Sequence, residues 1–224
     1  MTIDKAVLND ILALWSDTYE TDVDRAEKCM TSIRNTFAYS NVGIGSFKVN
    51  GQVWEFALSE NHAYMEARRR LKVALIAAQS QLEQTGSLMG AAAAMFAVED
   101  LVAFLIIKPG EFDYMVEALV EDEMEAEAYE TDEAKNEAYD GYKLDWESRL
   151  QNNPAKAVAD HKGWGWDTIF DMQYLTFDVG GAAIYYLDAF GWEDVLLADA
   201  GNPQDKPFHT SVTYSGVICW RAKK

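Results

Sequence analysis

A run of twenty residues, 88–107, constrains the fold most strongly, because Glu99 and Asp100 are its only polar side chains. A helix of this length spans about 30 Å, which matches both a small domain and a bilayer. In lipid the two carboxylates would cost roughly 2.5 kcal/mol or more each, and no second spanning segment or positive flank accompanies them. Ser87 can cap such a helix, and Lys108-Pro109-Gly110 can end it. The run therefore predicts the buried central helix of a soluble domain, without membrane contact.

Two other segments alternate with the period of β-strands. Residues 46–49 and 52–58 flank Asn50-Gly51, which is the strongest short hairpin signal. A two-residue turn places the last residue of the first strand opposite the first residue of the second. Because a lone hairpin is marginal in water, we expect the alternating segment 211–220 to add a third strand. The sequence thus predicts a small three-stranded antiparallel sheet, made of an N-terminal hairpin plus a C-terminal strand.

The rest of the chain shows helical periodicity, which predicts a mainly α fold in one globular domain over residues 1–224. Gly180-Gly181 would weaken an exposed helix by roughly 1 kcal/mol per glycine, so we expect Gly181 to lie against another helix with no room for a side chain. Asn152-Asn153-Pro154 is expected to break the helical pattern, and residues 161–166 are expected to form a second loop. The predicted helices cover residues 4–19, 21–41, 59–86, 112–124, 167–190 and 193–199.

Composition narrows the class of protein. The N-terminus is acidic and amphipathic where a secretory leader would be basic and then apolar, so we expect a cytoplasmic protein. Cys29 and Cys219 lie far apart and the chain has only three histidines, so no metal site and no cofactor are expected. The net charge of −18 argues against direct binding of nucleic acid or an anionic membrane and favours a basic protein partner.

The negative charge is concentrated in residues 111–147, called here the acidic segment. It holds fifteen acidic residues against two lysines, so it carries −13 of the −18. Tyr129, Tyr139, Tyr142 and Trp146 provide aromatic anchors that a disordered acidic tail would lack. We therefore expect an ordered acidic helical ridge. Its predicted partner-binding residues are Glu121, Asp122, Glu123, Glu125, Glu127, Glu130, Asp132, Glu133 and Glu137.

The usual catalytic and phosphate-binding motifs are missing: the sequence has no GxGxxG, GxxxxGK[ST], HExxH or GxSxG. Glu137 with Asp140, and Glu130 with Glu133, have a spacing that suits Mg²⁺ on a helix, as in helical nucleotide pyrophosphatases. The matching motif on a second helix is absent. We therefore predict that the protein is not an enzyme and keep a carboxylate/Mg²⁺-dependent helical nucleotide hydrolase as an alternative.

Two charged clusters each allow two interpretations. Arg68-Arg69-Arg70 can form an anion site or pair with the chain's own carboxylates, and we favour internal pairs. Glu99 and Asp100, in an apolar helix, can act as a general acid or base, or they can form a buried pair with those arginines. We favour the buried pair here as well.

Part of the chain resembles a known family. Residues 104–119, FLIIKPGEFDYMVEAL, resemble the helix-turn-helix of the PoNi-type immunity proteins, which protect bacteria from DNase toxins delivered by contact-dependent secretion. Residues 174–183, YLTFDVGGAA, followed by Gly191-Trp192-Glu193-Asp194, resemble the aromatic-acid-small helix of that family and the turn after it. The resemblance implies an acidic helical protein that occludes a basic nuclease toxin.

Charge and resemblance lead to one functional prediction. We expect a non-enzymatic acidic inhibitor or immunity protein whose helical ridge binds a basic partner, a toxin or nucleic-acid enzyme, as a DNA mimic or by blocking its site. A phage or bacterial structural or assembly protein is a further alternative. Size distinguishes the two, because a 25.2 kDa monomer favours the inhibitor and a large defined ring favours the assembly.

Overall fold

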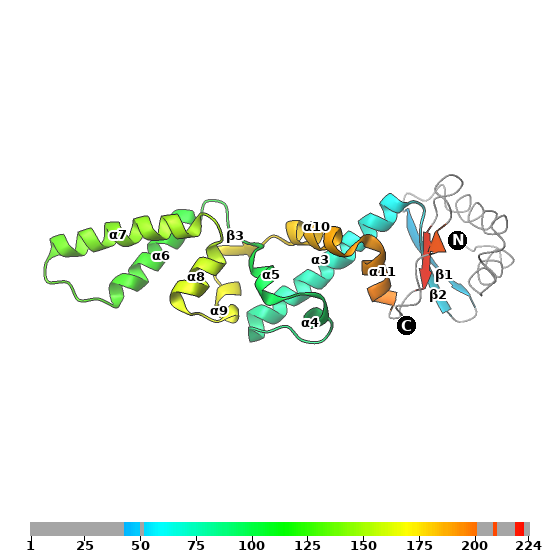
Figure 1. Ribbon diagram of the computed structural model, residues 1–224, viewed down its shortest axis with the longest axis horizontal. Helices are drawn as coiled ribbons and strands as arrows, with labels where there is room; N and C mark the ends of the chain where they lie inside the picture. The colour runs from blue at the N-terminus through cyan, green and yellow to red at the C-terminus, as the bar shows by residue number, and fades with distance from the viewer. Residues whose placement is uncertain (1–42, 50–51, 201–207, 210–217, 222–224) are drawn as a thin grey trace. The chain divides into compact units, whose positions relative to one another are not determined.

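The computed structural model describes residues 43–49, 52–200, 208–209 and 218–221, and the protein is mainly helical with small antiparallel sheets (Figure 1). Contacts divide the chain into two compact units. Unit 1 comprises Met1–Leu71 with Ala183–Lys224, and unit 2 comprises Lys72–Ala182. The single domain over residues 1–224 stays a prediction, because a compact unit is not by itself an independently folding domain. The helices predicted at 4–19 and 21–41 lie outside the described residues.

Unit 1 contains an antiparallel sheet of strand order β1-β2-β6-β5. Its strands are β1 (Ile44–Val49), β2 (Gln52–Ala57), β6 (Ile218–Arg221) and β5 (Phe208–His209). Val49 pairs with Gln52, which is the register of a two-residue turn, and β6 pairs with β2. The predicted hairpin and its third strand are therefore confirmed, although that strand is seen only at its end and β5 adds a fourth. Residues 50–51 and 210–217 lie outside the described part of the chain.

Helix α3 (Glu60–Thr85) begins after Ser59, whose Oγ accepts a hydrogen bond from the backbone N–H of His62 at 3.3 Å. Gly86 has a φ of 64° and ends the helix, as a residue in the left-handed region commonly does. The predicted helix over 59–86 is confirmed. In unit 1 the fully buried Phe56 and Trp220 belong to the sheet, and α11 (Trp192–Ala200) also buries Leu196.

A charged cluster joins α3 to the sheet of unit 1. The Arg70 guanidinium lies 2.5 Å from a Glu55 oxygen and 2.8 Å from Glu66, while Arg69 lies 2.7 Å from Glu66. Trp220 donates its indole N–H to Glu55 at 2.6 Å, and Arg70 lies over the Trp220 ring at 5.7 Å. Burial raises the pKa of Glu66, but the hydrogen bonds from the two arginines outweigh it and leave that pKa below its ordinary value. Internal pairing of the arginine triplet is thus confirmed for two of its members.

The predicted central helix over residues 88–107 is wrong. The segment forms α4 (Ala91–Met95), α5 (Val98–Val102) and the strand β3 (Leu105–Ile107). Phe96 adopts an extended conformation with φ −129° and ψ 141°, which ends α4. No residue of α4 is buried, whereas Phe96 and Leu101, which follow it, are buried.

The predicted buried pair between these acids and the arginine triplet is also wrong. Glu99 and Asp100 are exposed in the first turn of α5, where the helix dipole favours negative charge. Their exposure also removes the burial argument for a general acid and base. Arg68 forms no ion pair within the described residues, and its buried Nε has no hydrogen-bond partner there.

The single helix predicted over residues 167–190 is wrong as well. The chain forms α9 (Trp166–Phe170), β4 (Leu175–Phe177) and α10 (Val179–Phe190). Strand β4 pairs antiparallel with β3, with Leu105 opposite Phe177. The Asp178 carboxylate then starts a new helix by accepting a hydrogen bond from the backbone N–H of Gly181 at 2.9 Å.

Gly181 does not occupy the predicted crossing with another helix. A Cβ at this position would lie 2.4 Å from Oδ2 of Asp178, and the nearest atoms it would meet all belong to that side chain. The expectation of a close helix crossing is therefore wrong. Gly181 instead leaves room for the carboxylate that caps α10.

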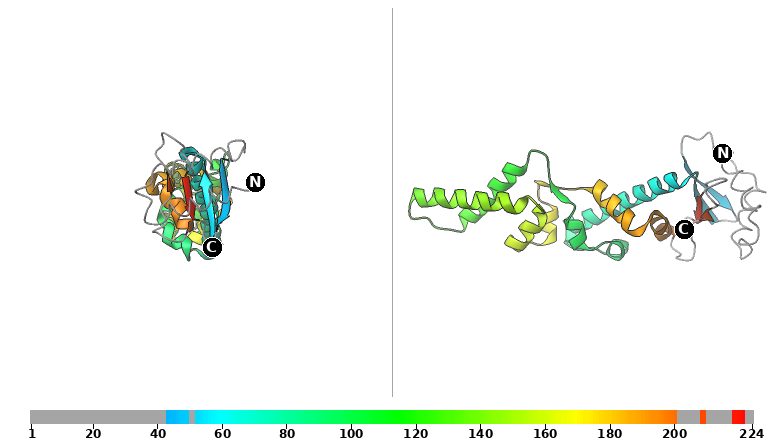
Figure 2. Two further views of the ribbon diagram at one scale, coloured as in Figure 1. Left: turned by 90° about the vertical axis from the view of Figure 1, so that its right-hand side faces the viewer. Right: turned by 45° about the horizontal axis from the view of Figure 1, so that its top comes forward.

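Unit 2 contains a hairpin of two helices, α6 (Phe112–Glu125) and α7 (Asp132–Leu150), followed by α8 (Pro154–Lys162). The first two lie side by side in Figure 1, and the right-hand view of Figure 2 shows them still adjacent. Their buried residues include Met115 and Leu119 of α6 and Trp146 of α7. The helix expected at 112–124 and the break before Pro154 are confirmed. None of the described helices combines the length and the apolar character that a membrane span requires.

Candidate functional site

The acidic segment predicted as a ridge occupies the helical hairpin of α6 and α7. The Thr131 hydroxyl caps α7 by accepting a hydrogen bond from the backbone N–H of Ala134 at 3.1 Å. Of the predicted partner-binding residues only Glu123 is half-buried. The exposed ones are Glu121, Asp122, Glu125, Glu127, Glu130, Asp132, Glu133 and Glu137.

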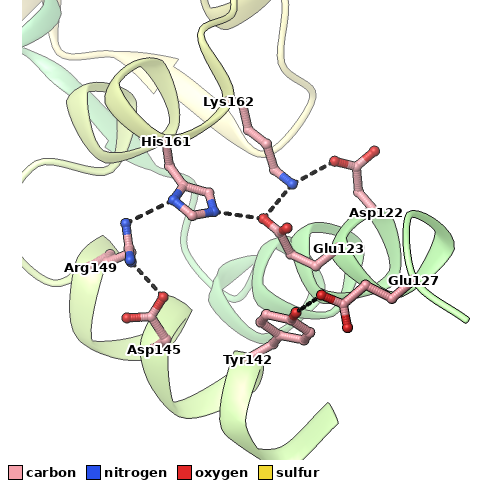
Figure 3. Close-up of polar contacts among 8 residues, drawn as sticks. All are labelled: Asp122, Glu123, Glu127, Tyr142, Asp145, Arg149, His161 and Lys162. Carbon is pink, nitrogen blue, oxygen red and sulfur yellow. Dashed lines mark hydrogen bonds and ion pairs between the residues drawn. The ribbon is translucent and has the colours of Figure 1, made fainter. Parts of the chain in front are cut away.

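Glu123 anchors the end of α6 to the end of α8 (Figure 3). Its Oε1 accepts a hydrogen bond from Lys162 at 2.5 Å and lies 2.8 Å from Nε2 of His161. Lys162 also pairs with Asp122 at 2.7 Å. Burial raises the pKa of Glu123, but the bonds from Lys162 and His161 outweigh it, so the net pKa is below its ordinary value. This carboxylate is held as an anion inside the protein's own structure.

The contacts of His161 assign its tautomer. An Arg149 nitrogen lies 3.0 Å from Nδ1, and because a guanidinium can only donate, Nδ1 must be the acceptor. The ring proton therefore sits on Nε2 and points to Glu123. The His161 ring also meets the buried Trp146 edge-on, with ring centroids 5.0 Å apart. Arg149 is itself fixed by Asp145 at 2.6 Å.

Two cations lie against the same indole ring. The Arg149 guanidinium and the Lys162 ammonium are each 5.8 Å from the centroid of Trp146. A cation within about 6 Å of an aromatic ring is attracted by the ring quadrupole. Trp146 was expected to be an aromatic anchor of the segment, and it is 1% exposed at the centre of this cluster.

Glu127 lies in the connection between the two helices and fixes this connection to α7. Its carboxylate accepts a hydrogen bond from the Tyr142 hydroxyl at 2.7 Å and another from Tyr129 at 3.1 Å. The bond from Tyr142 raises the pKa of that tyrosine to about 12. Both phenols were expected to anchor the segment, and both bind one of its acids.

Most of the charge in the acidic segment has no cation of the described residues beside it. Asp122, Glu123 and Asp145 have cationic partners, which leaves twelve of the fifteen acids without an ion pair among the described residues. Like charges without counter-ions extend a field into solvent over roughly one Debye length, about 8 Å at physiological ionic strength. The hairpin therefore presents a negative field from an ordered support.

Comparison with protein-family models, with curated proteins and with solved structures yields no significant match. The resemblance to the PoNi-type immunity proteins therefore stays a prediction. The function of this chain has to be inferred from its own geometry and charge.

The carboxylate pairs considered as metal ligands are not assembled into a larger cluster. Within the described residues no group of three or more His, Cys, Asp or Glu side chains could hold a metal ion. Glu130 precedes α7 while Glu133 lies in its first turn, so only Glu137 and Asp140 share a helix.

Two groups of side chains were missed by the sequence analysis. His161 and Lys162 were placed in a loop, but they form the last turn of α8, whose start is marked by Asn153-Pro154. A second group of four residues lines a shallow groove of about 360 Å³, and the segments that resemble the immunity family do not by themselves indicate it. Its lining residues are Glu111, Tyr114, Gln173 and Tyr174.

Proposed function

We propose that the protein is a non-enzymatic inhibitor or immunity protein that binds a basic partner, such as a nuclease toxin or another nucleic-acid enzyme, through the acidic segment. The bound hairpin occupies the surface on which the partner binds phosphates. We expect a cytoplasmic protein that acts by occupying this surface and not by chemistry of its own.

The observation that supports the proposal is the unpaired charge on the helical hairpin. Most of these acids lie on α6 and α7, and Glu123 and the buried Trp146 hold these helices in place. A concentrated field of one sign attracts an oppositely charged surface and raises the association rate. An ordered scaffold reduces the conformational entropy lost on binding.

The structure also selects which acids to change. Glu123 and Glu127 support the hairpin, so a loss of binding after reversal of their charge could result from a change in the fold. Glu121, Glu125, Glu130 and Glu133 are exposed and have no ion pair among the described residues. Their joint change to lysine alters the field while leaving the anchors in place.

The test begins with capture of the partner from host lysate and continues with stopped-flow binding of the purified partner over a salt series. We expect the association rate to fall by about tenfold or more as salt screens the field, and the quadruple lysine variant to bind with a similarly reduced rate. A matched control reverses four exposed acids outside the segment, namely Glu99, Asp100, Asp171 and Asp188. A flat salt response, or equal loss in the control, contradicts the proposal.

A further inference from the structure

The shallow groove lies where the start of α6 meets the start of β4, within unit 2. Glu111 and Tyr114 are one turn apart, and the other two lining residues, Gln173 and Tyr174, precede β4. The backbone N–H of Lys108 donates to the carbonyl of Tyr174 at 2.9 Å and that of Glu111 donates to the carbonyl of Lys108 at 3.0 Å. These bonds hold the two segments in register and bring the four residues together.

Among the described residues, the polar side-chain groups of this groove have no partner. Within the described residues none of the four lining side chains forms an ion pair or a side-chain hydrogen bond. Glu111 differs in this respect from the acids at 66 and 123, which are bound by cations of the chain. It stands just before the first turn of α6, where the helix dipole stabilises a negative charge.

The combination of lining groups defines a chemical class of ligand. Two tyrosine rings, of which Tyr114 is 61% exposed, offer flat faces with negative quadrupoles, and Glu111 offers a carboxylate. A guanidinium stacks on aromatic faces and pairs with a carboxylate through two parallel hydrogen bonds. Glu111 and Tyr114 also belong to the acidic segment, which carries a charge of −13, so the local charge favours a cation.

We propose that this groove receives an arginine side chain of the basic partner. The identity of the partner rests on the function proposed above, whereas the preference for arginine rests on the groove alone. The guanidinium stacks against Tyr114 and Tyr174 and pairs with Glu111. The acidic hairpin then determines how fast the partner arrives, and the groove determines which residue of the partner is held.

The charge of Lys108 is expected to weaken the binding of an arginine in the groove. Its ammonium donates a hydrogen bond to the Gln173 carbonyl, so a positive charge stands beside the groove. That charge opposes a second cation. Replacing Lys108 by glutamine should therefore strengthen arginine binding.

The experiment uses the full chain and N-acetyl-arginine amide as the probe, followed by NMR of the tyrosine rings. The neutral analogue N-acetyl-citrulline amide has nearly the same shape and serves as the ligand control. We expect saturable shifts at Tyr114 and Tyr174, with the citrulline compound binding several-fold more weakly. Glu111→Gln should remove the preference for arginine, and Tyr114→Ala should weaken binding by about two- to five-fold. Glu117→Gln, an exposed acid on the same helix, is the matched control and should bind like the parent.

The outcomes separate this proposal from the proposed function. Equal shifts with the arginine and citrulline compounds overturn the groove proposal, because charge would then have no part in recognition. The absence of shifts at these rings with either compound also overturns it, because the groove would then not bind the probe. If the partner binds with a steep salt response but ignores Glu111→Gln and Tyr114→Ala, the function stands and the groove proposal fails. If arginine binds as expected while partner binding is insensitive to salt, the groove proposal stands and the acidic hairpin loses its role.

Discussion

Replacing Glu123 by glutamine tests the anchor between α6 and α8. The change keeps the shape of the side chain and removes the charge that Lys162 and His161 contact at 2.5 and 2.8 Å. Hydrogen bonds to charged groups contribute about 1.5–3 kcal/mol, and removing one partner of a buried ion pair costs about 3–5 kcal/mol. Lys162 is only 10% exposed, but it retains Asp122, whose side chain is 50% exposed. We therefore expect a loss of about 2 kcal/mol in the free energy of unfolding.

Thermal unfolding and native-state hydrogen exchange measure this loss. In a chain of this size 1 kcal/mol corresponds to about 2–4 °C, so the melting temperature should fall by about 4–8 °C. Exchange should accelerate first at amides of α6 and α8, which the anchor joins. Glu125→Gln is the control, because Glu125 is exposed and should change stability by less than about 0.5 kcal/mol.

The pH dependence gives a second readout of the same anchor. The pKa of Glu123 is lower in the folded protein than its ordinary value of 4.5. Its stabilising contribution is therefore complete above about pH 4.5 and is lost as pH falls through the lowered pKa. The stability difference between the parent and Glu123→Gln should shrink in that window. Equal stability of the two glutamine variants at pH 7, or a difference that stays constant down to pH 3, would refute the reasoning.

Two further predictions concern single hydrogen bonds. In an NMR titration of the tyrosines, Tyr142→Phe should remove a group with a pKa of about 12, and Glu127→Gln should lower that pKa toward 10.0, while a Tyr142 pKa that stays at 12 would contradict the role of Glu127. Asp178→Ala should cost about 1 kcal/mol and accelerate hydrogen exchange in the first turn of α10, because it removes the cap on Gly181. Asp188→Ala, at an exposed position in the same helix, is the control, and equal exchange in both variants would speak against the cap.

Sequence patterns predicted the elements whose signals are local. The register of β1 with β2, the start of α3 at Ser59 and its end at Gly86 all follow from short-range turn and cap chemistry. The single helices predicted over residues 88–107 and 167–190 are wrong for one shared reason. Apolar periodicity does not distinguish a long helix from two short helices and a strand, and β3 and β4 form because each provides the other's partner.

The sequence predicted where the acidic residues concentrate, but it did not predict the contacts that each of them makes. The concentration of acids in residues 111–147 is plain in the sequence, but the use of individual acids is not. Glu123 is bound by residues 38 and 39 positions away, and Glu127 by Tyr142, 15 positions away. The groove between the start of α6 and β4 depends on the same long-range strand pairing. Neither feature leaves a pattern within a window of one helix.

The strand order of unit 1 has a consequence for synthesis. Strand β2 has β1 on one side and β6 on the other, and more than 150 residues separate β2 from β6 in the chain. Unit 2 lies entirely within that interval. A ribosome therefore adds every residue of unit 2 before it adds β6. Until then the edge of β2 and the Glu55 carboxylate lack the strand and the Trp220 indole that they later bind. The sheet of unit 1 thus begins with strands that are made before unit 2 and is completed by a strand that is made after it.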